Sequence, residues 1–485
     1  MPLNRRQFFA TAAAAGGAFV VARPNGALGA PLDPDGWATS RSSRLFSGTR
    51  LVHGDLHNHT VRSDGAGQPD RAFASMRAAG LDFAALTDHA TVSKLSGPAV
   101  PVGICQGASC GLAGVTEASW TEALRLADLE NRDGTFTAIR GFEWSSPQLG
   151  HLNVWFGKTW VDVLATGGVD TTAGTAQFVH DGGAPITNEQ AAAIGSAFAA
   201  SPTTKVGMAG FQDWLKADPG RPVLGGGNDS IAGFNHPGRE PGRYGQFALD
   251  PVLRSRMVSI EVFNRGEDYL FEGTDSGVQS PIQQCLNAGW KPGLAGVTDE
   301  HGTNWGTPEN NGRTGIYVTT LSRAGVRAGL ESRRFFASRL RGLRVDASAN
   351  GAPMGNDLPH DSGTITFRLD LDRGPNWHGR QMFVQVLQSG QPGELLPRVV
   401  RALTVTMPKP DQPVITFEVP INAANGSWIV LRVSDPGSTD TNPGQGNKAI
   451  VEDSRAHGTA YQGLGPAIAY TSPFFLTAKE QETPA

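Results

Sequence analysis

The sequence predicts an α/β protein in which a barrel of alternating strands and helices precedes a small all-β sandwich. From about 45 to 340, short apolar runs alternate with stretches of helical periodicity. From about 345 to 478 the helical periodicity disappears, and strand-like runs separated by Gly, Pro, Asn and Asp follow one another. With 485 residues, the chain is long enough for these two domains.

Residues 1–30 are predicted to form a twin-arginine-type signal peptide for export to the periplasm or the medium. Arg5 and Arg6 precede Gln-Phe-Phe, and an Ala-rich apolar run extends from Ala10 to Ala22. The run is too short to span a bilayer, so we expect no transmembrane segment in the mature chain. An ordinary secretory signal is the alternative interpretation.

The composition is that of a soluble globular protein, with 39% hydrophobic residues, 18% charged residues and a formal net charge of −4. This slightly acidic balance argues against general nucleic-acid binding, because no excess of Lys and Arg is present to displace counterions from phosphates. It allows a small phosphorylated substrate. Cys105 and Cys110 flank a glycine-containing loop and are candidates for a local disulfide. Cys285 falls on an apolar helical pattern and is predicted to be a buried free thiol.

The first strand–helix–strand unit shows how polar residues follow the predicted strands. An apolar run leads into His57 and His59, and a helical pattern that opens at Pro69 comes next. The buried strand Leu81–Leu86 is then followed by His89. Because functional groups of parallel-strand barrels collect at the carboxyl ends of the strands, we expect these histidines to share one edge of the sheet.

The same alternation continues along the chain and predicts a closed or nearly closed α/β barrel, interrupted by an insertion at about 159–221. The further predicted helices are 117–131, with Ser119 and Glu122 as a capping box, 189–200, 211–217, 281–288 and 322–334. The further predicted barrel strands are 135–142, 152–156, 231–235, 258–263, 292–297 and 314–320. The predicted sandwich strands are 364–371, 381–388, 400–407, 414–419, 427–434 and 467–475.

Histidines and carboxylates gather at the predicted strand ends of the barrel. Six of the 11 histidines belong to this set. A single histidine in such a place would more often be structural, but this many at successive strand ends predict a polynuclear site for divalent metal ions. The candidate metal ligands are His57, His59, Asp64, His89, Glu143, His151, His236, Asp299 and His301.

The region from about Thr49 to Ser338, about 60% of the chain, resembles the PHP (polymerase and histidinol phosphatase) superfamily of metal-dependent phosphoesterases. The resemblance implies a distorted (β/α)7 TIM-like barrel that holds two or three divalent ions, usually zinc, manganese or iron. The matching motifs are Asp55-Leu56-His57-Asn58-His59 with Ser63-Asp64-Gly65, Leu86-Thr87-Asp88-His89, Gly141-Phe142-Glu143, Asn235-His236-Pro237 and Val297-Thr298-Asp299-Glu300-His301.

Carried over to this chain, the resemblance implies three ion positions, with Glu143 shared by the first two. Some members have a histidine where this chain has Asp64, a change that would weaken the third ion or favour a harder metal. The implied ligands are His57, His59, Glu143 and Asp299 for the first ion, Glu143, His151 and His236 for the second, and Asp64, His89 and His301 for the third.

The implied chemistry is hydrolysis of a phosphate ester by attack of a metal-bridging hydroxide on phosphorus. Asp299 or His301 would help to protonate the leaving alcohol. Arg239 and Arg313 are candidate phosphate clamps, because a guanidinium matches two phosphate oxygens at once. A structural or surface arginine is the alternative interpretation for each.

We therefore expect an exported metallohydrolase that acts on a small phosphorylated substrate, with phosphomonoesters favoured. One alternative is phosphodiester cleavage, including exonuclease action. Another is a non-catalytic envelope or carbohydrate-binding protein, which the near-complete ligand set disfavours. The C-terminal domain is a candidate for association with the cell envelope.

Overall fold

The computed structural model describes residues 40–91, 94, 114–168, 207–306, 312–436 and 465–478. These residues belong to one compact unit, Asp35–Ala485. The predicted signal peptide, the predicted helix at 189–200 and the candidate disulfide between Cys105 and Cys110 lie outside the described residues. No helix in the described ranges is long and apolar enough to cross a membrane.

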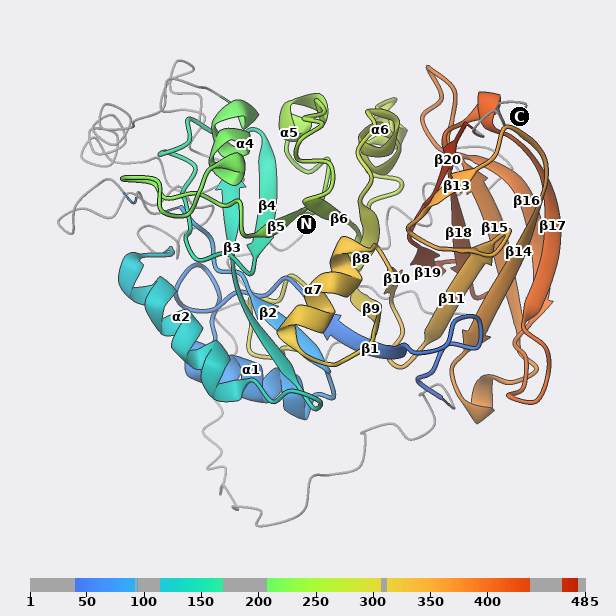
Figure 1. Ribbon diagram of the computed structural model, residues 1–485, viewed down its shortest axis with the longest axis horizontal. Coiled ribbons are helices and arrows are strands. Elements are labelled where there is room, and N and C mark those ends of the chain that lie inside the picture. Colours follow the sequence, from blue (N-terminus) through green and yellow to red (C-terminus); the bar gives the residue numbers. More distant parts are fainter. Residues whose placement is uncertain are drawn as a thin grey trace, which may run out of the picture. The chain divides into compact units, whose positions relative to one another are not determined.

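Short strands alternate with helices in the first two thirds of the chain (Figure 1). The strands are β1 (Arg50–Asp55), β2 (Phe83–Leu86), β3 (Thr137–Ser146), β4 (Gly150–Trp155), β5 (Ile231–Phe234), β6 (Met257–Asn264), β7 (Glu267–Asp268), β8 (Gly293–Val297), β9 (Arg313–Val318) and β10 (Phe335–Ser338). The helices are α1 (Pro69–Ala78), α2 (Glu117–Glu130), α4 (Met208–Lys216), α5 (Arg243–Gln246), α6 (Pro281–Asn287) and α7 (Arg323–Glu331), with a 3-10 turn at Thr274–Ser276.

The strands of this region form a mixed sheet in which most members run in one direction. β1, β2 and β3 are parallel neighbours, and so are β5, β6 and β8. β4 runs antiparallel between β3 and β5, and β9 runs antiparallel between β1 and β10. The carboxyl ends of the parallel strands therefore lie at one edge of the sheet, together with the amino end of β4.

A closed (β/α)7 barrel is not confirmed by the strand pairing. Within the described ranges, β8 pairs with β6, and β9 pairs with β1 and β10, but no ladder joins β8 to β9. The two strands do approach each other, because the Thr314 hydroxyl donates to the Gly296 carbonyl oxygen over 2.8 Å. The structure is a mixed α/β fold with one large sheet and few helices.

Helices α1 and α2 pack together beside β2 and β3 (Figure 1). The predicted start of α1 at Pro69 is confirmed. The predicted capping box of α2 is wrong in its residues: Thr116 is the cap, and its side chain accepts a hydrogen bond from the backbone N–H of Ser119. Glu122 instead accepts hydrogen bonds from Arg125 on the exposed face of the helix.

The last third of the chain forms two β-sheets that share a core. Leu369 of one sheet and Val384 and Leu431 of the other are fully buried in it. Strands β11, β12, β14 and β17 form one sheet, and the others belong to the large sheet. The strands are β11 (Arg344–Ala349), β12 (Ala352–Pro353), β13 (Asp357–Pro359), β14 (Ser362–Asp372), β15 (Gln381–Gln388), β16 (Arg398–Thr406), β17 (Ile415–Asn422), β18 (Trp428–Ser434), β19 (Ala467–Thr471) and β20 (Phe474–Thr477), with 3-10 turns at Pro375–Trp377 and Ala423–Asn425.

The large sheet continues from the first two thirds of the chain into this β-region, because β10 pairs with β9 on one side and with β19 on the other. The sequence pattern does not predict β10, since it extends the preceding helix to 334, whereas α7 ends at Glu331. The boundary between a domain at 45–340 and one at 345–478 stays a prediction. Cys285 is a buried free cysteine, as predicted.

Candidate metal centre

The candidate metal ligands lie at the sheet edge where the parallel strands end. Glu143 lies inside β3, which continues to Ser146 and so extends beyond its predicted end. His151 is the second residue of β4, and the reversed direction of this strand brings it to the same edge. The other ligands follow parallel strands: His57, His59 and Asp64 follow β1, His89 follows β2, His236 follows β5, and Asp299 and His301 follow β8.

Four side chains form the buried centre of the site. The Nε2 atoms of His57 and His59 lie 3.0 Å apart. Nε2 of His57 is 3.2 Å from Oε1 of Glu143 and 3.4 Å from Oδ1 of Asp299. Nε2 of His59 is 3.4 Å from Oε2 of Glu143 and 3.3 Å from the same Asp299 oxygen. None of the four residues is more than 2% exposed.

This central group fits a divalent metal ion. Oε1 of Glu261 lies 2.8 Å from Nδ1 of His57, so Nδ1 carries the proton and Nε2 presents its lone pair to the group. Nε2 faces a second imidazole nitrogen and two carboxylates, and either a proton on the ring or a metal ion in its place balances their negative charge. In a tetrahedral site with metal–ligand distances of about 2.0–2.1 Å, the ligand atoms lie about 3.3–3.4 Å from one another, close to the observed separations.

A second group adjoins Glu143. Nδ1 of His151 and Nε2 of His236 lie 3.2 and 3.4 Å from Oε1 of Glu143. The Glu240 carboxylate stands at the other nitrogen of each ring, 3.9 Å from Nε2 of His151 and 3.7 Å from Nδ1 of His236. Glu240 is 5% exposed and is not among the predicted site residues. Its position four residues after His236 is the one signal in the sequence that could have indicated it.

The third predicted group is also brought together. Nε2 of His89 lies 3.5 Å from Oδ1 of Asp64, and Nε2 of His301 lies 3.2 Å from the other oxygen of this carboxylate. His59 contributes a ring nitrogen to the same group, and ligand atoms of the four residues lie within 4.8 Å of one another. Nδ1 of His89 is 2.6 Å from Ser145 Oγ, which fixes the orientation of the ring.

Two more buried carboxylates hold the loops that carry the ligands. Asp88 accepts hydrogen bonds from the Thr60 backbone N–H over 2.7 Å and from the Ser63 hydroxyl over 2.9 Å. Asp55 accepts hydrogen bonds from the backbone N–H groups of His57 and Thr298, each over 3.2 Å. These contacts tie the loop after β1 to the loops after β2 and β8.

The backbone of the site is strained at two of the ligands. His236 and Asp299 have positive φ angles of 27° and 49°, which for non-glycine residues cost about 1–3 kcal/mol each. Nearby contacts hold both conformations. The His236 N–H donates to Oε2 of Glu261 over 2.6 Å, and Nε of Arg265 donates to the Asp299 carbonyl oxygen over 3.3 Å. Strain that is held in this way is typical of functional sites.

The electrostatics of the site demand positive charge. Burial alone lowers the pKa of His57, but the Asp299, Glu143 and Glu261 carboxylates outweigh burial and raise this pKa well above its ordinary value. Burial, with His301 and His89 close by, lowers the pKa of His59 to about 3. Neighbouring imidazoles therefore differ sharply in their affinity for a proton. Bound metal ions would satisfy the same carboxylates.

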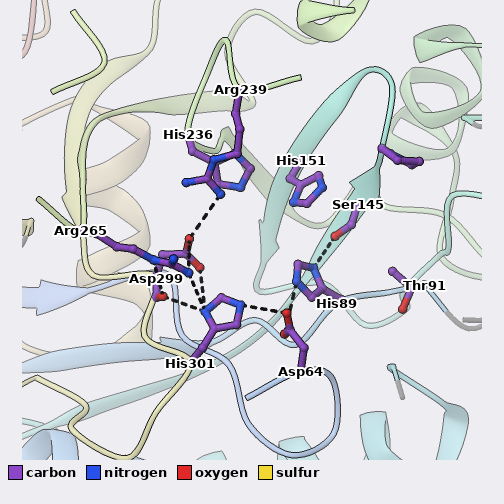
Figure 2. A pocket seen from close by; sticks show the side chains of 11 residues that line it. Asp64, His89, Thr91, Ser145, His151, His236, Arg239, Arg265, Asp299 and His301 are labelled. Atoms are coloured by element: carbon purple, nitrogen blue, oxygen red, sulfur yellow. Dashed lines mark hydrogen bonds and ion pairs between the residues drawn. The ribbon is translucent and has the colours of Figure 1, made fainter. Parts of the chain in front are cut away.

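A cavity of about 350 Å³ opens over the cluster (Figure 2). Arg239 and Arg265 approach Asp299 from its wall, with Nη atoms 3.9 and 3.2 Å from Oδ2 of Asp299. Arg265 was not predicted. Arg313 is a structural arginine, because it is 1% exposed and donates to the Gly306 carbonyl oxygen over 2.9 Å. The lining residues are Asp64, His89, Thr91, Ser145, Pro147, His151, His236, Arg239, Arg265, Asp299 and His301.

No protein-family model matches this chain, and no curated protein matches its sequence. Among solved structures, it is similar to a two-domain protein from Bacteroides vulgatus that contains a predicted PHP-like metal-dependent phosphoesterase (15% identity, TM-score 0.37, 83% of this chain and 94% of that one). It is also similar to a protein from Bifidobacterium adolescentis described as a metal-dependent phosphoesterase (15% identity, TM-score 0.28, 57% and 95%). A third is an amidohydrolase from Chromobacterium violaceum (16% identity, TM-score 0.24, 51% and 87%). PHP-like metal-dependent phosphoesterases are thus among the structures that this chain resembles.

Proposed function

We propose that this protein is a metal-dependent hydrolase that cleaves phosphate esters. The observation that carries the proposal is the buried group of His57, His59, Glu143 and Asp299, whose ligand atoms lie 3.0 to 3.4 Å apart beside two guanidinium groups. We expect two or three divalent ions, of zinc, manganese or iron, on the predicted ligands, with Glu240 as an additional partner of the second group.

The cavity suits a small substrate with a phosphoryl group. Its volume of about 350 Å³ is at the lower end of the range for small-molecule sites. Arg239 and Arg265 present donors on one wall, opposite the edge formed by Asp64 and His89 (Figure 2). Guanidinium groups pair well with phosphoryl oxygens, and this pairing supports a phosphomonoester as the substrate.

The reaction replaces one P–O bond by another. A water oxygen forms a bond to phosphorus, the bond from phosphorus to the alcohol oxygen breaks, and the alcohol leaves with a proton. When bound, divalent ions lower the pKa of water and neutralise the phosphoryl oxygens. Arg239 and Arg265 would orient the phosphoryl group. With only the first two ions bound, His301 holds no metal and is the better placed proton donor, because its side chain lines the cavity and is 25% exposed whereas that of Asp299 is 2% exposed.

The test is turnover of a chromogenic phosphomonoester and of a chromogenic phosphodiester by the mature protein, with zinc, manganese and iron(II) supplied separately. We expect hydrolysis of the monoester and its loss in Asp299→Asn. The matched control is Asp411→Asn, at an exposed position of the C-terminal β-region. Turnover of the diester alone would assign a phosphodiesterase. Bound metal without turnover of either ester would contradict a phosphoesterase and support a binding protein.

A further inference from the structure

One β-hairpin supplies the second arginine of the cavity. Strands β6 and β7 pair through Phe263 with Asp268 and Asn264 with Glu267, which leaves Arg265 and Gly266 as a two-residue turn. Arg265 has a positive φ of 52°, as such turns require, although glycine or asparagine is preferred there. Its side chain reaches from this turn to Asp299 and lines the cavity.

The same hairpin also holds the first arginine. Nη2 of Arg239 donates to the Tyr269 hydroxyl over 2.9 Å and lies 3.4 Å from Oε2 of Glu267. The Tyr269 hydroxyl in turn donates to the same Glu267 oxygen. The positions of both cavity arginines therefore depend on the position of the segment from Asn264 to Tyr269.

The hairpin is fixed at its buried centre by the C-terminal β-region. Asp268 is 3% exposed, and its Oδ2 accepts a hydrogen bond from the Tyr470 hydroxyl of β19 over 2.9 Å. Its Oδ1 accepts one from the Leu270 N–H over 3.1 Å. The Tyr470 ring also packs against Phe263 of the hairpin, with ring centroids 5.2 Å apart.

Tyr470 is itself held within the β-region. Nε of Arg432 in β18 donates to the Tyr470 hydroxyl over 3.2 Å, and Nη1 of Arg432 donates to Oε1 of Gln385 in β15 over 2.7 Å. Burial raises the pKa of Tyr470 well above its ordinary value, so the hydroxyl keeps the proton that it donates to Asp268. A continuous path of hydrogen bonds thus leads from three strands of the β-region to the hairpin.

We propose that Tyr470 is a positioning residue of the candidate active site. By holding Asp268 of the hairpin, it lets the C-terminal β-region fix the positions of the two cavity arginines. The proposal rests on the proposed function only in its choice of a phosphate ester as the ligand. On this proposal, the β-region contributes to substrate binding without binding a ligand itself.

The test compares Tyr470→Phe with Tyr317→Phe in the metal-loaded full chain. Tyr317 is a matched control, because it is also buried and its hydroxyl donates to a residue of the β-region, Val345, over 3.2 Å, while its ring contacts are with Phe336 and Arg334 rather than with the described residues of the hairpin. Two quantities are measured: amide hydrogen exchange of the peptide covering 263–270, and kcat and KM for a chromogenic phosphomonoester. We expect Tyr470→Phe to speed exchange in this peptide and to raise KM about tenfold with little change in kcat. Metal content should match the wild type.

Exchange at 263–270 that equals the wild type in Tyr470→Phe, or an equal rise in KM in Tyr317→Phe, would overturn the proposal. If the wild type hydrolyses no ester, the proposed function fails, and the exchange comparison alone decides whether Tyr470 positions the hairpin. If Tyr470→Phe does not fold, Asp268→Asn replaces it. An amide has one acceptor oxygen where Asp268 uses two, so one of the bonds to Tyr470 and Leu270 is lost and exchange should again increase.

Discussion

Nε2 of His57 and Nε2 of His59 lie 3.0 Å apart in a fully buried position, each within 3.4 Å of the Glu143 and Asp299 carboxylates. Two imidazole nitrogens at this distance need either a proton shared between them or a metal ion that both ligate. The candidate metal centre, the proposed hydrolysis and most of the predictions below follow from this relationship.

Removal of metal should destabilise the protein. Without an ion, Asp299 keeps the Arg265 and Arg239 guanidinium groups, but the fully buried Glu143 carboxylate has only protonated imidazoles as its counter-charge. At a free metal concentration 100 times Kd, bound metal should contribute about 2.7 kcal/mol to the free energy of unfolding. Dialysis against a chelator should lower Tm, and re-addition of zinc or manganese should restore it. An unchanged Tm after the metal has been removed would count against structural coupling of the ions.

Glu240→Gln should weaken the binding of one metal ion. The Glu240 carboxylate stands at the outer nitrogens of His151 and His236, where it would orient both rings or ligate an ion itself. Loss of such a carboxylate should lower affinity for that ion about 10- to 100-fold. Calorimetric titration of metal into the metal-free protein measures this affinity. Glu117→Gln, at an exposed position, is the control, and equal affinities in the two variants would assign Glu240 no role.

His53 should make stability depend on pH. Burial, together with Arg41 and Arg313, lowers its pKa in the folded protein to about 3, whereas the unfolded chain has the ordinary value of about 6.5. Between these values the unfolded state binds a proton that the folded state does not. The free energy of unfolding should therefore fall as pH decreases below 6.5, by up to about 1.4 kcal/mol per pH unit from this residue.

The variant His53→Leu should remove that contribution. The side chain packs edge-on against Phe336, a contact that leucine retains in part. Denaturant unfolding between pH 6.5 and 4.5 should show that the free energy of unfolding depends less steeply on pH in the variant than in the wild type. Identical slopes would show that His53 does not stay neutral in the folded protein.

The proposed export signal predicts that export fails when its arginine pair is replaced. If Arg5 and Arg6 are read by the twin-arginine pathway, replacement of both by Lys should leave the precursor in the cytoplasm. Cell fractionation with detection of the protein measures this. Normal export of the Lys variant would indicate an ordinary secretory signal instead, because that signal requires only positive charge near its start.

Local patterns predicted most of the secondary structure and the ligands. A histidine or carboxylate that interrupts an apolar run marks a strand end, and this holds for His89 after β2 and His236 after β5. Glu143 was predicted in the same way, at the end of the strand 135–142, but it lies inside β3, which continues to Ser146. The structure brings all nine predicted ligands to one edge of the sheet, and metal binding by them stays a prediction.

What the sequence did not predict depends on distant contacts. Arg265 lies on a hairpin turn without an apolar pattern, and only the folding of that hairpin over Asp299 brings it to the cavity. The reversed direction of β9 and the pairing of β10 with β19 are set by strands far apart in the chain. Periodicity within one segment carries no information about such pairing.

Metal analysis of the purified mature protein tests the account most directly. Elemental mass spectrometry should find two or three divalent ions per chain, and Glu143→Gln should lose at least one of them, because Glu143 lies within 3.4 Å of ring nitrogens from five histidines. A protein that has been supplied with zinc, manganese and iron(II) and binds none of them would contradict the metal centre and the hydrolase proposed from it.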